Sequence, residues 1–162
     1  MTYDPDTLAA RLAVTDVVIA YANGLDSRDW AAFRALFEDV IDIDYSSLKS
    51  IQGRIAAEAW VDRVRVLGGF DSTLHKLSNL RVALDGDAAT VTSYVDAAHF
   101  IHAAGRDLAA FACGTYVHRV NRHGDAWKIA GCTFTVAGYQ TGRAAFDEAF
   151  AAARAVYEGQ AR

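Results

Sequence analysis

The sequence predicts an α+β fold in which helices come first and a strongly curved antiparallel sheet follows, with an internal pocket at the open end of the sheet. Apolar residues recur at helical spacing within residues 7–38. The apolar period then changes to two, first within residues 40–46 and again from residue 75 onward, and turns containing Gly and Asp separate the later strands. A sheet that covers helices on one face leaves space at its open end, where we expect the pocket.

Length and composition predict one domain spanning residues 1–162. The chain is 52% hydrophobic and has a mean hydropathy of +0.07, which is enough apolar material for a core. Its formal net charge is −4, and its Lys and Arg residues are scattered without a basic stripe. Nucleic-acid binding is therefore not expected.

Targeting signals and redox motifs are also not expected. Asp4, Asp6 and Arg11 interrupt the apolar run that a signal peptide would need, and no segment is expected to approach the roughly 20 apolar residues of a membrane-spanning helix. The chain should thus be cytoplasmic, without a membrane partner. Cys113 and Cys132 lie in expected strands and form no C-x-x-C motif, which favours buried, reduced thiols.

Two helices are expected at residues 7–21 and 28–38. Between them, Asn23-Gly24 offers an exit from the first helix, and Asp26 or Ser27 can cap the second. Asp26 would then lie at a helix junction among large apolar residues, where a carboxylate is costly unless something pairs with it.

The remaining elements follow in order. A strand at residues 40–46 would bury Ile41, Ile43 and Tyr45 on one face. A third helix at residues 55–67 would turn Ile55, Ala59, Val66 and either Trp60 or Val64 inward, and Gly68-Gly69 would end it. Four strands at residues 75–84, 89–103, 109–121 and 127–136 form the rest of the sheet, and a last helix at 144–159 carries Phe146, Phe150, Ala153 and Tyr157 on one side.

This order of elements, with an aspartate between the first two helices and a histidine opening the long strand after the third, resembles the SnoaL-like branch of the NTF2-like (cystatin-like α+β) superfamily over residues 7–136. The resemblance implies a cone in which the sheet wraps the N-terminal helices. In its members scytalone dehydratase and hexachlorocyclohexane dehydrochlorinase, an Asp at this junction pairs with a His at the start of the long strand. Asp26 and His75 match those two positions.

An Asp–His pair has a clear chemical use. A carboxylate bonded to one ring nitrogen fixes the tautomer, leaves the other nitrogen as a base and stabilises the imidazolium that forms. The structural alternatives are that Asp26 merely caps a helix and that His75 merely meets solvent at a strand end. On a regular strand, Leu77, Asn79 and Arg81 would share the face of His75.

Further site residues follow from the resemblance. His99 matches a second cavity-facing histidine of the dehydratase, and His102 would point the other way. Tyr45 matches a tyrosine that orients a water against the substrate carbonyl, whereas Leu25 stands where the dehydratase has its other tyrosine. Three more residues are candidates for substrate binding, namely Tyr21, Trp30 and Arg143.

Metal and cofactor sites are not expected. A site built from His75, His99 and a carboxylate is conceivable, but the chain has no short ligand pair such as H-x-x-x-H. No glycine-rich phosphate loop is recognisable either. His118 and His123 are interpreted as surface or turn residues.

The predicted function is a cofactor-independent lyase, with His75, Asp26, Tyr45 and His99 as catalytic residues and a small aromatic or polycyclic substrate. Tyr45 and His99 would stabilise a developing oxyanion. The alternatives are an isomerase or polyketide-cyclase-type enzyme, a non-catalytic NTF2-like ligand- or protein-binding module, or a dioxygenase small subunit. A homodimer or homotrimer is expected through the outer sheet face, which would carry Tyr94 or the row Tyr116, His118 and Val120.

Overall fold

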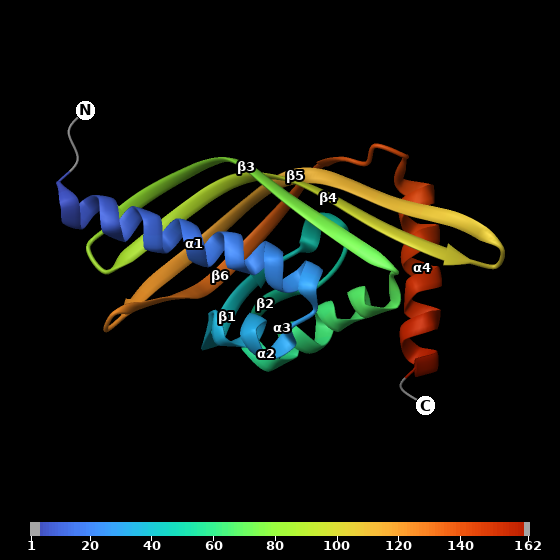
Figure 1. Cartoon of the computed structure of the whole chain (residues 1–162), viewed down its shortest axis with the longest axis horizontal. Coiled ribbons are helices and arrows are strands. Elements are labelled where there is room, and N and C mark those ends of the chain that lie inside the picture. Colours follow the sequence, from blue (N-terminus) through green and yellow to red (C-terminus); the bar gives the residue numbers. More distant parts are fainter. Residues whose placement is uncertain (1–3, 161–162) are drawn as a thin grey trace.

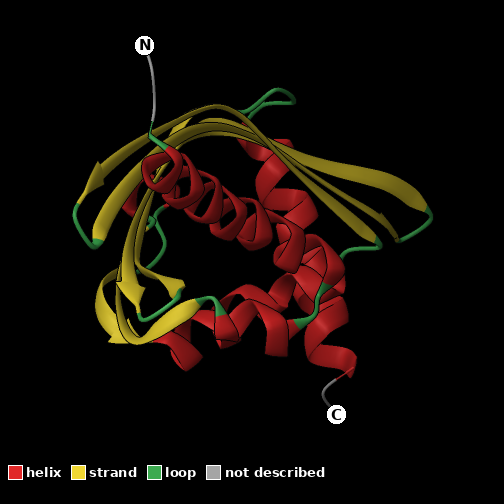
Figure 2. Ribbon diagram, turned by 60° about the vertical axis from the view of Figure 1, so that its left-hand side comes forward, coloured by secondary structure: helices red, strands yellow, loops and turns green. Residues whose placement is uncertain are grey.

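The computed structural model describes residues 4–160 and confirms the predicted α+β fold. Six strands form one sheet in the order β2-β1-β6-β5-β4-β3, in which all neighbours are antiparallel except β1 and β6. The helices gather on the concave side of this curled sheet (Figures 1 and 2). The elements are α1 (Pro5–Ser27), α2 (Trp30–Ala35), β1 (Phe37–Asp44), η1 (Ser46–Leu48), β2 (Gln52–Ala56), α3 (Ala57–Val64), η2 (Arg65–Gly69), β3 (Ser72–Asp85), β4 (Ala88–Ala103), β5 (Arg106–His123), β6 (Ala126–Gly138) and α4 (Arg143–Gln160).

The first helix does not end at Asn23-Gly24, as the sequence suggested, but continues to Ser27. Gly24 serves close packing instead, because a Cβ there would lie 2.7 Å from Cδ2 of Phe33 on α2. The helix ends where Arg28 adopts a left-handed conformation, with φ of 59°, and donates its N–H to the Gly24 carbonyl.

The N-cap of the second helix is Asp29, not Asp26 or Ser27. The Asp29 carboxylate accepts the backbone N–H of Ala32 at 3.0 Å. Asp26 therefore lies in the last turn of α1, where its carboxylate is not needed as a cap.

The edge hairpin of β1 and β2 is a second departure from the prediction. β1 starts at Phe37 rather than residue 40, and β2 was expected to be loop and helix. Ile55 pairs with Ile41 across this hairpin, so α3 begins only at Ala57. Its buried residues are Ala57, Trp60, Val61 and Val64, and Ala59 is exposed.

A bulge in β3 reverses which residues face inward. Asn79 adopts a φ of 52°, and the pairing with β4 shifts between Ser78 and Arg81. His75 and Leu77 face inward before the bulge, while Asn79 and Arg81 are exposed after it. The expectation that these four residues share one face is therefore wrong beyond Leu77.

Helix α1 lies in the concavity of the sheet and contacts β3, β4 and β6 (Figure 1). Val14 and Val18 are fully buried there. By length and composition alone, Pro5–Ser27 passes the test for a membrane-spanning helix, contrary to the sequence expectation. The core helix of a soluble protein passes the same test, and the inner face of α1 is accounted for by its packing on the sheet.

Helix α4 closes the far end of the sheet by packing on β4, β5 and η2 (Figure 1). Phe146 and Ala153 of its predicted apolar side are buried, together with Ala149, whereas Phe150 and Tyr157 are half-buried. Contact with η2 is unusually close, because a Cβ on Gly69 would lie 1.9 Å from the Ala153 carbonyl oxygen.

The outer sheet face carries Leu74, Tyr94 and Phe100, all of which are largely exposed. His118 and Tyr116 belong to the inner face and are buried, so their expected placement on the outside is wrong. The homodimer or homotrimer expected on the outer face stays a prediction.

We predict that Gly69→Ala destabilises the fold, because the added Cβ would prevent α4 from packing in its present position. The clash is with helix backbone, which cannot move aside as a side chain can, so a loss of about 1–3 kcal/mol or more in unfolding free energy is expected in urea denaturation. Gly68→Ala is the matched control. Its Cβ would make an ordinary 3.7 Å contact with Tyr157, and a change within about 0.5 kcal/mol is expected. Equal effects of the two variants would contradict this account of the α4 contact.

Candidate active site

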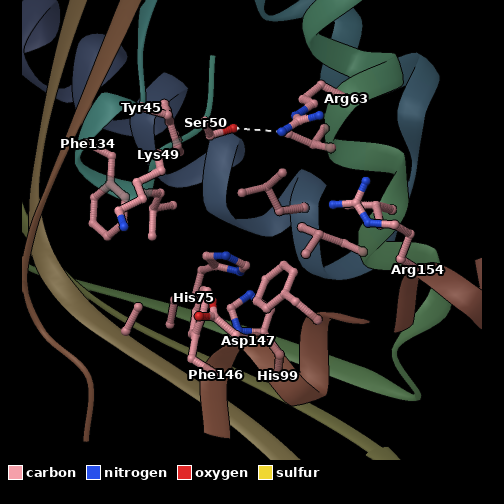
Figure 3. Close-up of a pocket in the computed structure, with 18 of the residues that line it drawn as sticks. Tyr45, Lys49, Ser50, Arg63, His75, His99, Phe134, Phe146, Asp147 and Arg154 are labelled. Carbon is pink, nitrogen blue, oxygen red and sulfur yellow. Dashed lines mark hydrogen bonds between the residues drawn. The ribbon is translucent and has the colours of Figure 1, made fainter. Parts of the chain in front are cut away.

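A cavity of about 310 Å³ lies between the concave sheet face, α3 and α4 (Figure 3). Five of the predicted site residues line it, namely Tyr21, Tyr45, His75, His99 and Arg143. Trp30 does not. It packs on Phe33 outside the cavity, so its predicted role in substrate binding is not supported.

Asp26 and His75 lie together at the edge of this cavity. Nδ1 of His75 is 2.7 Å from Oδ1 of Asp26. The same carboxylate accepts the Thr73 hydroxyl and the His75 backbone N–H, each at 2.8 Å. All three donors belong to β3, so the last turn of α1 is bonded to the start of the strand through a single side chain.

The hydrogen bonds decide the charge of Asp26. Its side chain is only 20% exposed, and burial by itself raises the pKa of a carboxyl. The hydrogen bonds from the ring and backbone of His75, the charge interaction with that ring, and the Thr73 hydroxyl outweigh burial and hold the pKa of Asp26 below its usual value. Asp26 is thus a carboxylate at neutral pH.

A carboxylate can only accept hydrogen bonds, which fixes the tautomer of neutral His75. Nδ1 carries the proton and donates it to Asp26, so Nε2 keeps its lone pair. No residue in 4–160 forms a hydrogen bond with Nε2, and the ring faces the cavity (Figure 3). This nitrogen can accept a proton from a molecule in the cavity.

His99 lies on β4 beside His75, with 5.2 Å between the ring centroids. Its Nδ1 donates to the Ala110 carbonyl at 3.1 Å. Burial and the neighbouring His75 lower the pKa of His99 to about 4, so the ring is neutral at pH 7. Neutral His99 offers the cavity an acceptor at Nε2 and cannot be the oxyanion donor that the sequence suggested.

Two tyrosines that line the cavity carry hydroxyls that can act as hydrogen-bond donors. Oη of Tyr21 on α1 and Oη of Tyr45 at the end of β1 are 2.7 Å apart, and both side chains line the cavity. Burial raises the pKa of each hydroxyl well above its usual value, so both stay protonated. Since they share one hydrogen bond, one hydroxyl hydrogen remains to donate elsewhere.

The position of Tyr21 is relevant to Leu25, which stands where the dehydratase has its other tyrosine. Leu25 precedes Asp26 and lines the cavity without a polar group. Tyr21 stands one helical turn earlier on the same face of α1, and it brings a second hydroxyl to Tyr45 from there.

His118 and Cys132 form a buried layer behind this pair that the sequence interpretation missed. Sγ of Cys132 is 3.8 Å from Oη of Tyr45 and 3.4 Å from Nε2 of His118. Burial lowers the pKa of His118 to about 3 and raises the pKa of the Cys132 thiol to about 12. Both are therefore neutral. Cys132 is a buried free thiol as predicted, whereas the free thiol of Cys113 is only half-buried. The alternation of Tyr116, His118 and Val120 on one strand was the available signal, but it was assigned to the wrong face.

Arg143 begins α4 at the mouth of the cavity. Its guanidinium is already engaged, because Nε lies 2.7 and 2.9 Å from the two carboxylate oxygens of Asp147 and Nη1 lies 3.0 Å from the Tyr139 hydroxyl.

Within residues 4–160, no three His, Cys, Asp or Glu side chains are grouped closely enough to hold a metal ion.

A model of the SnoaL-like domain matches residues 6–133. The chain belongs to the SnoaL-like family. A relative, the uncharacterised protein Rv2910c of Mycobacterium tuberculosis H37Rv, is 30% identical over 124 residues, which are 75% of this chain and 82% of the relative.

Two solved structures are similar to this SnoaL-like protein in fold. A proposed scytalone dehydratase from Novosphingobium aromaticivorans DSM 12444 has a TM-score of 0.72 at 21% identity, covering 82% of this chain and 87% of the other. The hexachlorocyclohexane dehydrochlorinase LinA-type3 from Novosphingobium barchaimii LL02 has a TM-score of 0.67 at 19% identity, covering 85% and 93%.

We predict that His118 makes the folded state sensitive to acid. The pKa of His118 falls from its usual 6.5 to about 3 on folding, so below pH 6.5 the unfolded chain binds a proton that the folded chain excludes. Its contribution to stability is complete above pH 6.5 and declines as the pH falls. His118→Gln removes this group at similar volume, so from pH 7 to pH 5 the variant should lose about 2 kcal/mol less unfolding free energy than the wild type. Parallel stability curves for the two proteins would contradict the prediction.

Proposed function

We propose that this SnoaL-like protein is a cofactor-independent lyase acting on a small aromatic or polycyclic substrate. The observation that carries the proposal is the 2.7 Å contact between His75 Nδ1 and Asp26, with the opposite ring nitrogen left for the cavity. A binding site needs shape and apolar walls, whereas a fixed imidazole tautomer backed by a carboxylate is the arrangement that proton abstraction requires.

The first step of the reaction is proton transfer to Nε2 of His75. The proton comes from a carbon next to an electron-withdrawing group, or from a hydroxyl before carbon–carbon cleavage. Asp26 stays ionised and stabilises the imidazolium that forms. As charge develops on a substrate oxygen, the hydroxyl hydrogen of the Tyr21–Tyr45 pair that is not used between them donates to it, in place of the weakly accepting Sγ of Cys132.

The second step expels the leaving group. After cleavage of the C–H bond, its electron pair forms a double bond as hydroxide or halide leaves the neighbouring carbon; hydroxide takes the proton of the His75 imidazolium and departs as water, whereas after loss of halide the imidazolium releases its proton to solvent. After loss of a hydroxyl proton, the oxygen electron pair forms a carbonyl as the carbon–carbon bond breaks, and the carbanion fragment takes the proton back from His75. The names of the similar structures, a proposed scytalone dehydratase and a hexachlorocyclohexane dehydrochlorinase, describe eliminations of the first two kinds, with loss of water and of halide. Isomerases and polyketide cyclases would share the first step and differ only in where the intermediate reacts next.

A test of the first step does not require the natural substrate. 2-Tetralone is a bicyclic ketone whose α-protons are weakly acidic, and a base in the cavity should catalyse their exchange for deuterium in D2O. We predict that His75→Gln abolishes the enzyme-dependent exchange, a loss on the order of 10²–10⁴-fold, because the general base is gone. Proton NMR of the ketone measures the rate directly, and circular dichroism checks that the variant is folded.

Asp26→Asn should reduce the exchange nearly as much, because an amide can donate to Nδ1 and so reverse the tautomer. Tyr45→Phe should cost less, since Tyr21 remains as a donor. Exchange at wild-type rates in folded His75→Gln would refute the proposal. Binding of 2-tetralone without any exchange would favour the binding-module alternative instead.

A further inference from the structure

The mouth of the cavity is positively charged although the chain as a whole is acidic. Among residues 4–160, four cationic side chains line the cavity, namely Lys49, Arg63, Arg143 and Arg154, against a single carboxylate, Asp147. The formal net charge of the chain is −4. The positive charge at this opening is therefore a local feature and does not follow from composition.

Three of these cations lack a carboxylate partner among residues 4–160. Arg63 bonds only the Ser50 hydroxyl, at 3.0 Å, and no ion pair is formed by Lys49 or Arg154. Asp147 is taken by Arg143. Two carboxylates on α3 near Arg63 are also engaged elsewhere, Glu58 by Arg34 and Asp62 by Arg65.

The three cations come from separate parts of the chain. Lys49 follows η1 in a left-handed conformation, Arg63 lies on α3 and Arg154 lies on α4. Figure 3 shows Arg63 and Arg154 on one side of the cavity and Lys49 on another, with His75 and His99 at its base. Like charges gathered around one opening repel each other, and an anion bound between them would relieve that repulsion.

We propose that the substrate of this cavity is an aromatic or polycyclic carboxylate, held with its carboxylate at the mouth and its ring toward His75. The aromatic part of this inference rests on the proposed function, and the charge rests on the three cations. Arginine guanidinium groups match a carboxylate in shape and charge. A cavity of about 310 Å³ lies at the lower end of the range for ligand pockets, which favours a molecule of few rings.

The test uses two probes of the same shape and different charge, 2-naphthoate and its neutral amide, 2-naphthamide. Isothermal titration calorimetry at pH 8 and low salt should give a dissociation constant about tenfold lower for the naphthoate. Arg63→Gln and Arg154→Gln should each weaken naphthoate binding about threefold and leave naphthamide unchanged, as expected for solvent-exposed charges. Added salt should reduce the preference for the same reason.

Two further variants make the test specific to the mouth. Asp147→Asn removes the one carboxylate that the described part of the chain places in the lining and releases Arg143, so it should tighten naphthoate binding. Arg81→Gln removes an exposed cation from the outer side of β3, away from the cavity, and should change neither constant.

The outcomes separate this inference from the proposed lyase function. Equal affinity for the two probes, or equal loss in Arg81→Gln and Arg154→Gln, would overturn the inference while leaving the exchange chemistry of His75 untouched. A naphthoate preference in a protein that shows no exchange of 2-tetralone would support the inference and refute the lyase. Absence of binding by either probe would overturn the carboxylate class together with the aromatic substrate.

Discussion

The carboxylate of Asp26 is the contact on which the site depends. It joins the last turn of α1 to the first residues of β3 by accepting from the Thr73 hydroxyl, the His75 backbone and the His75 ring. The Asp26 carboxylate thereby both joins α1 to β3 and orients the ring of His75. A partly buried carboxylate is costly unless it is bonded, and the bonds that satisfy it also set the ring of His75 in one tautomer. Any rearrangement that frees Asp26 would release both the helix end and the base, so packing and chemistry are coupled here through a single side chain.

Neutral polar groups surround Asp26 and His75 on the inner side of the cavity. His99, Tyr21, Tyr45 and the buried His118–Cys132 contact all keep their uncharged forms at pH 7, because burial penalises the charged form of each. In such surroundings a hydroxyl donor acts on a substrate oxygen with little competition from water. In the proposed reaction, these surroundings would favour proton transfer between His75 and the substrate over loss of the proton to a second titrating group.

The fold and the Asp26–His75 contact could be predicted from the sequence because they depend on local pattern and element order. Features that arise where a single residue changes the register or the direction of the chain could not be predicted. The bulge at Asn79 moves Arg81 off the face of His75, and Arg28, rather than Asn23-Gly24, ends the first helix. Residues of the same types as Asn79 and Arg28 also occur in ordinary strands and helices, so the residue type alone does not predict the bulge or the helix end. His118 was misplaced because a period of two defines two faces of a strand but does not say which one is buried. The cations at the mouth were also missed. Lys49, Arg63 and Arg154 meet only when the unexpected β2 hairpin and the docking of α4 are in place.

Charge is distributed along the cavity in a way that bears on how a substrate is oriented. The mouth of the cavity is cationic, the proposed general base His75 lies deeper, and the innermost wall offers only neutral hydroxyls and rings. A molecule with one anionic end can satisfy the mouth only by leaving that end outside, because burying the anion against Tyr45 and Trp60 would remove it from water without a cationic partner. The apolar end must then be the part that reaches His75. The change from cationic side chains at the mouth to neutral groups inside would let such a molecule enter in one orientation only. A single general base can select one substrate proton among several only if the substrate is held in one orientation.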